Sequence, residues 1–151
     1  MMGDEMGLSN PEKGRRFREA AQPILEEHLG VRLCPEVPLE IGSPAKQHKF
    51  DLVADDRTWV LECKALAWRQ NGKIPNAKIT SISAAALCLR DLVQRGPARA
   101  IVLERATHVH RRETLAEYYA RLHSHNLARS VSLIEIDPEA GSLTWLIRND
   151  V

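Results

Sequence analysis

The chain has 151 residues, 44% of them hydrophobic, which suits one compact domain with a core and leaves little room for a second. Its 21 basic and 20 acidic residues leave a net charge of +1, so any nucleic-acid-binding surface must be a local basic patch. No apolar run approaches the roughly 20 residues that span a bilayer. Three scattered cysteines do not form a disulfide framework. We expect a single cytoplasmic domain over residues 1–151, with residues 1–8 as a flexible tail, reduced thiols and no membrane contact.

The first half of the chain predicts one helix and three strands. Residues 9–30 are typical of a helix, which Ser9 or Asn10 can cap, in which Pro11 suits the first turn, and which Gly30 can end. Pro23 removes one backbone hydrogen bond inside that helix. Strands are expected at residues 37–42, 48–55 and 58–66, and a polar loop at 67–76.

The second half predicts two helices and three strands. Residues 77–96 carry apolar positions three and four apart, with Val93 among those expected to face inward. A buried strand is expected at 98–105, a helix with Leu122 inward at 112–127, and two late strands at 131–137 and 142–148. Tyr118 or Tyr119 is expected in the core.

The order of these elements is αβββαβ followed by αββ. Three early strands joined by short loops must be antiparallel neighbours, and the helix at 77–96 is expected to cross over and add strand 98–105 to the same sheet. We therefore predict an α/β fold with an αβββαβ core, a mixed central sheet flanked by helices, and a C-terminal αββ extension.

The stretch "FDLVADDRTWVLECKAL" places charged side chains on the middle strands of this sheet. Alternation puts Glu62 and Lys64 on one face of their strand, and Asp51 with Lys49 and Val53 on the face opposite Phe50, Leu52 and Ala54. A two-residue turn at 56–57 or a four-residue loop at 55–58 would set Asp51 opposite Glu62, and Lys49 opposite Lys64. Directly opposed residues are about 4.5–5.5 Å apart at Cα.

Two carboxylates at that separation repel unless one is protonated or a cation lies between them. Mg²⁺ prefers hard oxygen ligands and often takes one or two carboxylates together with water and phosphate oxygens. Lys64, on the same face, could orient an attacking water or stabilise charge on a phosphate. An ordinary cross-strand pairing of a carboxylate with a lysine on a solvent face would give the same spacing.

The combination of Asp51, "Glu62-Cys63-Lys64" and the αβββαβ order resembles the PD-(D/E)XK nuclease superfamily, which has the restriction-endonuclease-like fold. The resemblance covers residues 14–104, with Phe50 where many members have proline. It implies Mg²⁺-dependent (or Mn²⁺-dependent) phosphodiester hydrolysis, usually of DNA. It also implies Asp51 and Glu62 as metal ligands and Lys64 as the catalytic lysine. An auxiliary acid on the first helix is expected at Glu19, with Glu26 as second choice.

The loop after the third strand is expected to carry nucleic-acid contacts at the rim of this site. Lys78 would lie in the first turn of a helix whose amides favour phosphate. Candidate contacts are Lys49, Trp68, Arg69, Lys73 and Lys78. His108 and His110 alternate on an extended segment but lack a third metal ligand.

Two functions remain open at this point. The first is a metal-dependent endonuclease or exonuclease acting on nucleic acid, DNA more than RNA. The second is a nuclease fold without catalysis that binds nucleic acid or protein. Because cutting two strands is easier with two sites related by a two-fold axis, a homodimer is also expected, with the late strands as interface.

Overall fold

The computed structural model describes residues 7–150, so the tail expected over residues 1–8 lies mostly outside the described part of the chain. The order of the elements is the one expected from the sequence. In chain order they are α1 (Asn10–Leu29), β1 (Leu33–Ile41), β2 (Lys46–Ala54), β3 (Trp59–Lys64), the 3₁₀ turn η2 (Gln70–Gly72), α2 (Asn76–Arg90), β4 (Ala98–Glu104), α3 (Leu115–His123), the 3₁₀ turn η3 (Ser124–Asn126), β5 (Val131–Asp137) and β6 (Ser142–Ile147).

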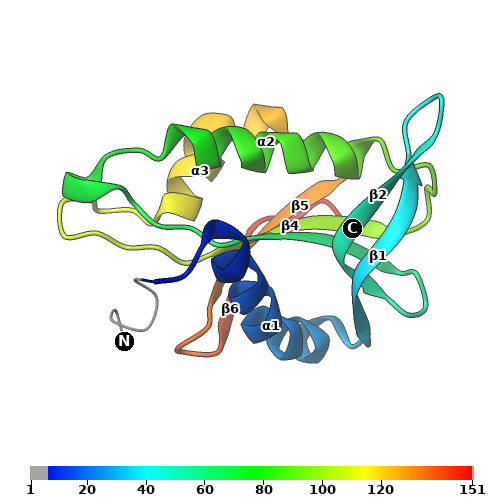
Figure 1. Cartoon of the computed structure of the whole chain (residues 1–151), viewed down its shortest axis with the longest axis horizontal. Coiled ribbons are helices and arrows are strands. Elements are labelled where there is room, and N and C mark those ends of the chain that lie inside the picture. Colours follow the sequence, from blue (N-terminus) through cyan, green and yellow to red (C-terminus); the bar gives the residue numbers. More distant parts are fainter. Residues whose placement is uncertain (1–6, 151) are drawn as a thin grey trace.

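The six strands form one open mixed sheet in the order β1-β2-β3-β4-β5-β6. The pairs β1–β2, β2–β3 and β5–β6 are antiparallel, whereas β3–β4 and β4–β5 are parallel. Helix α1 covers one face of the sheet, and α2 and α3 cover the other (Figure 1). The predicted α/β fold, with β3 in mid-sheet and β4 added by the crossover through α2, is confirmed.

Helix α1 begins and ends where its sequence predicts. The Ser9 hydroxyl accepts a hydrogen bond from the Glu12 amide, and the Glu12 carboxylate reaches back to Ser9, so the first turn is capped in both directions. Gly30 ends the helix with a left-handed φ of 67°. Pro23 lies inside the helix without ending it.

The β1–β2 ribbon changes face halfway along its length. Leu52 and Ala54 pack beneath α1, whereas Phe50 packs with Val53 in the core beneath α2. The expected common face for Phe50, Leu52 and Ala54 is therefore wrong. The change falls between the pairs Pro35–Leu52 and Val37–Phe50, where Glu36 has a φ of 54°, which twists the ribbon sharply.

Helix α2 is shorter than its apolar pattern predicts, ending at Arg90 instead of residue 96. The buried guanidinium of Arg99 on β4 explains this end, because it donates to the carbonyls of Leu89 (2.7 Å), Arg90 (3.2 Å) and Gln94 (2.8 Å). Val93, expected inside, is 48% exposed and lies beyond the end of the helix.

The C-terminal elements extend the sheet. Tyr118 and Tyr119 are buried as expected, but Leu122 on α3 is 44% exposed, so its inward placement is wrong. Strand β5 lies inside the sheet, with all its residues from Val131 to Ile136 buried, so a homodimer built on the late strands would have to use the edge strand β6. None of the helices in residues 7–150 combines the length and the apolar character that a membrane span requires.

We expect Arg99→Met to lower the free energy of unfolding by about 2 kcal/mol or more. The substitution removes a charged donor from three carbonyls at the end of α2, and hydrogen bonds to charged groups are worth about 1.5–3 kcal/mol. Urea denaturation would measure the loss, with Arg95→Met, at an exposed position in the same connection, as the matched control. Equal midpoints for the two variants would contradict this account of the helix end.

Candidate active site

The antiparallel register of β2 and β3 is the one that the sequence predicts. Leu52 pairs with Leu61 and Val53 with Val60, and the strands are joined by the four-residue loop 55–58. One further step in the same register sets Asp51 against Glu62. The ladder stops at that step, so the expected facing of Lys49 and Lys64 is not part of it.

Where the ladder between β2 and β3 ends, the two carboxylates accept hydrogen bonds from backbone amides. The Asp51 amide donates to Oε1 of Glu62 at 3.3 Å, and the Cys63 amide donates to Oδ2 of Asp51 at 2.8 Å. Each acidic side chain therefore reaches across the gap to the other strand. The pair is fixed in place by main-chain groups, which hold it more firmly than flexible side chains would.

Burial changes the acidity of both groups. Glu62 is 5% exposed, and burial together with the neighbouring Asp51 carboxylate raises its pKa to about 8. Burial also raises the pKa of Asp51, although the hydrogen bond from the Cys63 amide and the Lys64 ammonium oppose this rise. At neutral pH in the absence of a cation, Glu62 is therefore mostly protonated.

His48 is a third polar side chain beside the pair, and the sequence-based assignment missed it. Its Nε2 atom lies 3.5 Å from Oε1 of Glu62 and is buried without a hydrogen-bond partner. Burial lowers the pKa of His48, so its imidazole is neutral at pH 7. Its place on β2, three residues before Asp51, was the only signal available in the sequence.

Helix α1 presents a different residue to the site than expected. Glu19 is exposed, on the side of the helix away from the buried stripe of Phe17, Ala21 and Leu25, so the structure does not bring it to the carboxylate pair. Glu26, the second choice, accepts a hydrogen bond from the Leu33 amide at 2.9 Å and closes the turn into β1.

Arg18 occupies the place expected for an acid. Its side chain is 12% exposed, its Nε is buried without a hydrogen-bond partner, and its charge favours the ionised form of Asp51, lowering that pKa. Its Nη1 lies 3.9 Å from Glu36, a long and partly exposed ion pair. A helical wheel centred on Phe17 would have predicted this, because position 18 borders the buried stripe and position 19 faces away.

Lys64, the last residue of β3, is half-buried, and its ammonium favours ionisation of both Asp51 and Glu62. Lys78 lies in the first turn of α2, as expected. Burial lowers the pKa of Lys78, and the charges of Lys64 and Lys13 lower it further, whereas Glu104 raises it. Lys64 on β3 and Lys13 on α1 thus both lie within electrostatic range of Lys78 on α2.

A cleft of about 610 Å³ opens beside these lysines, between the start of α1, the start of α2 and the ends of β3 and β4. Four cationic side chains line it: Lys13, Arg16, Lys78 and Arg105. Three acidic side chains also line it: Glu104, Asp137 and Glu139. Asp51 and Glu62 are not in its lining, and on this side the cleft begins at Ala65, the residue after the end of β3.

The remaining predicted contacts have mixed outcomes. Lys49, Arg69 and Lys73 are exposed. Trp68 is only 9% exposed, and its indole N–H donates to the carbonyl of Ala106 at 3.0 Å, so its expected position on the rim is wrong. This hydrogen bond satisfies the one polar atom of the ring, so the ring can be buried.

The two carboxylates of the pair are the kind of hard oxygen ligand that a divalent cation such as Mg²⁺ prefers. Two mainly buried carboxylates, one with a pKa near 8, leave negative charge uncompensated when both ionise, and Mg²⁺ or Mn²⁺ would compensate it. Among the described residues, no group of three or more His, Cys, Asp or Glu side chains is arranged to hold a metal. A cation here would therefore take its other ligands from water or substrate, as Mg²⁺ commonly does.

Comparisons with known proteins are sparse. No protein-family model matches the chain, and no curated protein matches it. Among solved structures, the chain is similar to the crystal structure of an XisH family protein from Nostoc punctiforme, with a TM-score of 0.49 and 13% sequence identity. The match covers 87% of this chain and 98% of that one, and it does not bear on the chemistry of the site.

We expect Glu62→Gln to remove a pH dependence from the stability of the metal-free protein. Below pH 4.5 Glu62 is protonated in both the folded and unfolded states. Between pH 4.5 and about 8 only the unfolded state loses this proton, so the free energy of unfolding falls as pH rises, and above about 8 the loss is complete.

The loss is on the order of a few kcal/mol, since one pKa unit corresponds to about 1.4 kcal/mol. Urea denaturation in EDTA from pH 5 to 9 would measure it. The wild type should lose stability relative to Glu62→Gln across this range. Parallel curves for the two proteins would show that the Glu62 carboxyl ionises normally in the folded state.

Proposed function

We propose that the protein is a metal-dependent phosphodiester hydrolase that acts on nucleic acid, with DNA as the expected substrate and Mg²⁺ or Mn²⁺ as cofactor. The observation that carries this proposal is the buried pair of Asp51 and Glu62, held across the gap between β2 and β3 by main-chain amides, with Lys64 beside it. The pair, its spacing from Lys64 and the αβββαβ order together resemble the PD-(D/E)XK nucleases.

In this proposal each residue has a separate task. Asp51 and Glu62 hold the cation, which supplies Lewis-acid polarisation of the phosphoryl oxygens and a more acidic water. Lys64 orients the attacking water and stabilises negative charge on the phosphate, because its ammonium already lies within electrostatic range of both carboxylates. Arg18 favours the ionised form of Asp51, which is the form that binds a cation.

The reaction consumes one water molecule. Its oxygen bonds to phosphorus, the bond from phosphorus to the leaving oxygen breaks, and the proton lost by the water is balanced by the proton that the leaving oxygen gains. The products are a phosphomonoester and a free hydroxyl. The cleft beside Lys78 supports this proposal because its cationic lining would neutralise phosphates that flank the cleaved bond.

We expect Lys64→Ala to lower the single-turnover cleavage rate by about 100-fold or more, the scale of losing one electrostatic stabiliser. Lys64 is half-buried at the end of its strand, so its removal should leave thermal unfolding nearly unchanged. Rates would be measured with Mg²⁺ or Mn²⁺ at matched occupancy of labelled single-stranded, duplex and forked DNA and of RNA.

Arg129→Ala, at an exposed position before β5, is the matched control for loss of one positive charge. Equal rates for wild type and Lys64→Ala would end the assignment of this lysine. Binding of the substrates without cleavage under any of these conditions would favour a nuclease fold that binds and does not cut.

We expect Asp51→Asn to weaken Mn²⁺ binding without disrupting the strands. The asparagine carbonyl can still accept the Cys63 amide, but it brings no negative charge to the cation. Because a bound cation needs both carboxylates ionised, wild-type affinity should rise with pH up to about 8. The EPR signal of free Mn²⁺ in a titration measures binding without an activity assay, and the same dissociation constant for both proteins would place the metal elsewhere.

A further inference from the structure

Two loops project from neighbouring ends of the parallel strands β3 and β4, and they are tied together along their length. They span residues 65–75 and 105–114, and we call them the paired loops. In Figure 1 both lie at the left end of the molecule, beyond the sheet. The ends of adjacent parallel strands meet at one edge of a sheet, so the paired loops lie at the same edge as Lys64.

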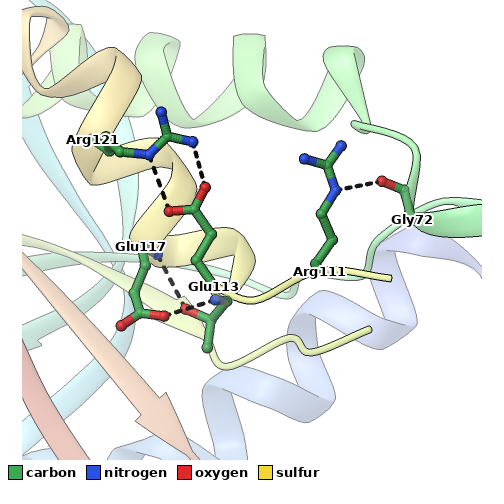
Figure 2. A network of polar contacts seen from close by, with 6 residues as sticks. Gly72, Arg111, Glu113, Glu117 and Arg121 are labelled. Carbon is green, nitrogen blue, oxygen red and sulfur yellow. Dashed lines mark hydrogen bonds and ion pairs between the residues drawn. The ribbon is translucent and has the colours of Figure 1, made fainter. Parts of the chain in front are cut away.

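Two hydrogen bonds join the loops to each other, and a third joins the first loop to the last residue of β4. The Leu66 amide donates to Oε1 of Glu104 at 3.1 Å, and the Trp68 indole N–H donates to the Ala106 carbonyl at 3.0 Å. Farther out, Nε of Arg111 donates to the Gly72 carbonyl at 2.8 Å, as Figure 2 shows.

The outer level is also tightly packed. The Arg111 guanidinium lies 4.5 Å from the centre of the Trp68 ring, which adds a cation–π contact. Gly72 has a φ of 72°, and a Cβ there would lie 3.2 Å from Nδ1 of His108, so a side chain would both strain the backbone and crowd the second loop. The paired loops therefore form one rigid surface.

That surface is strongly basic. The paired loops contain five arginine or lysine residues and one carboxylate, Glu113. Arg111 is used internally, and Glu113 accepts hydrogen bonds from Nε and Nη2 of the Arg121 guanidinium (Figure 2). The other four cations, Arg69, Lys73, Arg105 and Arg112, are exposed, and no ion pair among the described residues includes any of them.

Two acidic residues beside the loops accept hydrogen bonds from Thr114. The Glu117 carboxylate accepts from the Thr114 amide at 2.7 Å, and Glu135 accepts from the Thr114 hydroxyl. None of the four exposed cations forms an ion pair within residues 7–150, although Arg105 shares the lining of the cleft with Glu104, Asp137 and Glu139. A cluster of cations without ion pairs on a rigid surface fits a polyanion that carries regularly spaced charges.

We propose that the paired loops bind the sugar–phosphate backbone of a nucleic acid, with Arg69, Lys73, Arg105 and Arg112 as the phosphate contacts. This inference rests on the proposed function. Lys64 is the last residue of β3, and the first loop follows it directly, so a nucleic acid cleaved beside Lys64 would continue over the loops. Nucleic acid fits better than an anionic membrane, because Val109 is the one large apolar side chain within residues 65–75 and 105–114 that is strongly exposed.

The test compares two double variants that lose the same charge. Arg105→Ala/Arg112→Ala removes two cations from the paired loops, and Arg95→Ala/Arg129→Ala removes two exposed cations that precede β4 and β5, at the opposite edge of the sheet. Fluorescence anisotropy with labelled single-stranded and duplex DNA, in EDTA and at several salt concentrations, measures binding without cleavage. Thermal unfolding confirms that each variant is folded.

We expect the loop variant to bind DNA about tenfold or more weakly, with the slope of log K against log salt reduced by about 2, while the control variant binds like wild type. Equal losses in both variants would show a diffuse charge effect and overturn the inference, as would wild-type binding by the loop variant. Binding of phosphatidylserine vesicles but not DNA by the wild type would overturn it too.

The outcome separates this inference from the proposed catalytic function. Loop-dependent DNA binding without cleavage by the wild type under any metal condition would support the interface and contradict the hydrolase. Metal-dependent cleavage by the wild type, with unchanged binding by Arg105→Ala/Arg112→Ala, would support the hydrolase and contradict the interface.

Discussion

The exchange of hydrogen bonds between Asp51 and β3 is the interaction on which the rest of the candidate site depends. In a regular antiparallel pair, each amide that points to the facing strand bonds to one of its carbonyls. Here the Cys63 amide bonds to the Asp51 carboxylate and the Asp51 amide bonds to the Glu62 carboxylate. The strands separate, and two acidic groups occupy the gap in fixed positions. Each strand is also held by its other neighbour, β2 by β1 and β3 by β4.

Burial then decides the chemistry that the pair can support. Neither carboxylate forms an ion pair closer than the 3.5 Å contact of Glu62 with His48, and burial makes that histidine neutral at pH 7. The remaining compensation comes from the more distant charges of Lys64 and Arg18, which favour the ionised form of Asp51 but leave the pKa of Glu62 near 8. In a site with this imbalance, either a proton on Glu62 or a bound cation would relieve the repulsion between the two carboxylates.

The sequence predicted the parts of this arrangement that depend on local periodicity and loop length. The positions of Asp51 and Glu62 followed from two-residue alternation and the four-residue loop between their strands, and both hold in the structure. The prediction for Glu19 failed because it matched a residue type to a helix and ignored the phase of that helix. The buried stripe through Phe17 turns Arg18, not Glu19, towards the sheet.

Other differences arise from tertiary contacts that no local pattern contains. Helix α2 ends at Arg90 because a side chain from the following strand, Arg99, takes its last carbonyls. Trp68 looked like a surface residue because its neighbours in the sequence are polar. It packs into the core, and Ala106, on a loop 38 residues later, offers a carbonyl that satisfies its indole nitrogen. Phe50 changes face at the point where Glu36, on the neighbouring strand, adopts a left-handed conformation.

Topology links the carboxylate pair to the loops beyond it. The parallel pairing of β3 and β4 makes both strands end at one edge, so the loops that follow them are neighbours although they are far apart in sequence. Arg111 shows how this edge is organised. Of the five cations in the paired loops, it is the one that packs on Trp68 and bonds to Gly72. Arg111 thereby holds the two loops together, and the other four cations remain exposed on these loops. A flexible basic loop would lose more conformational entropy on binding a polyanion than this surface would.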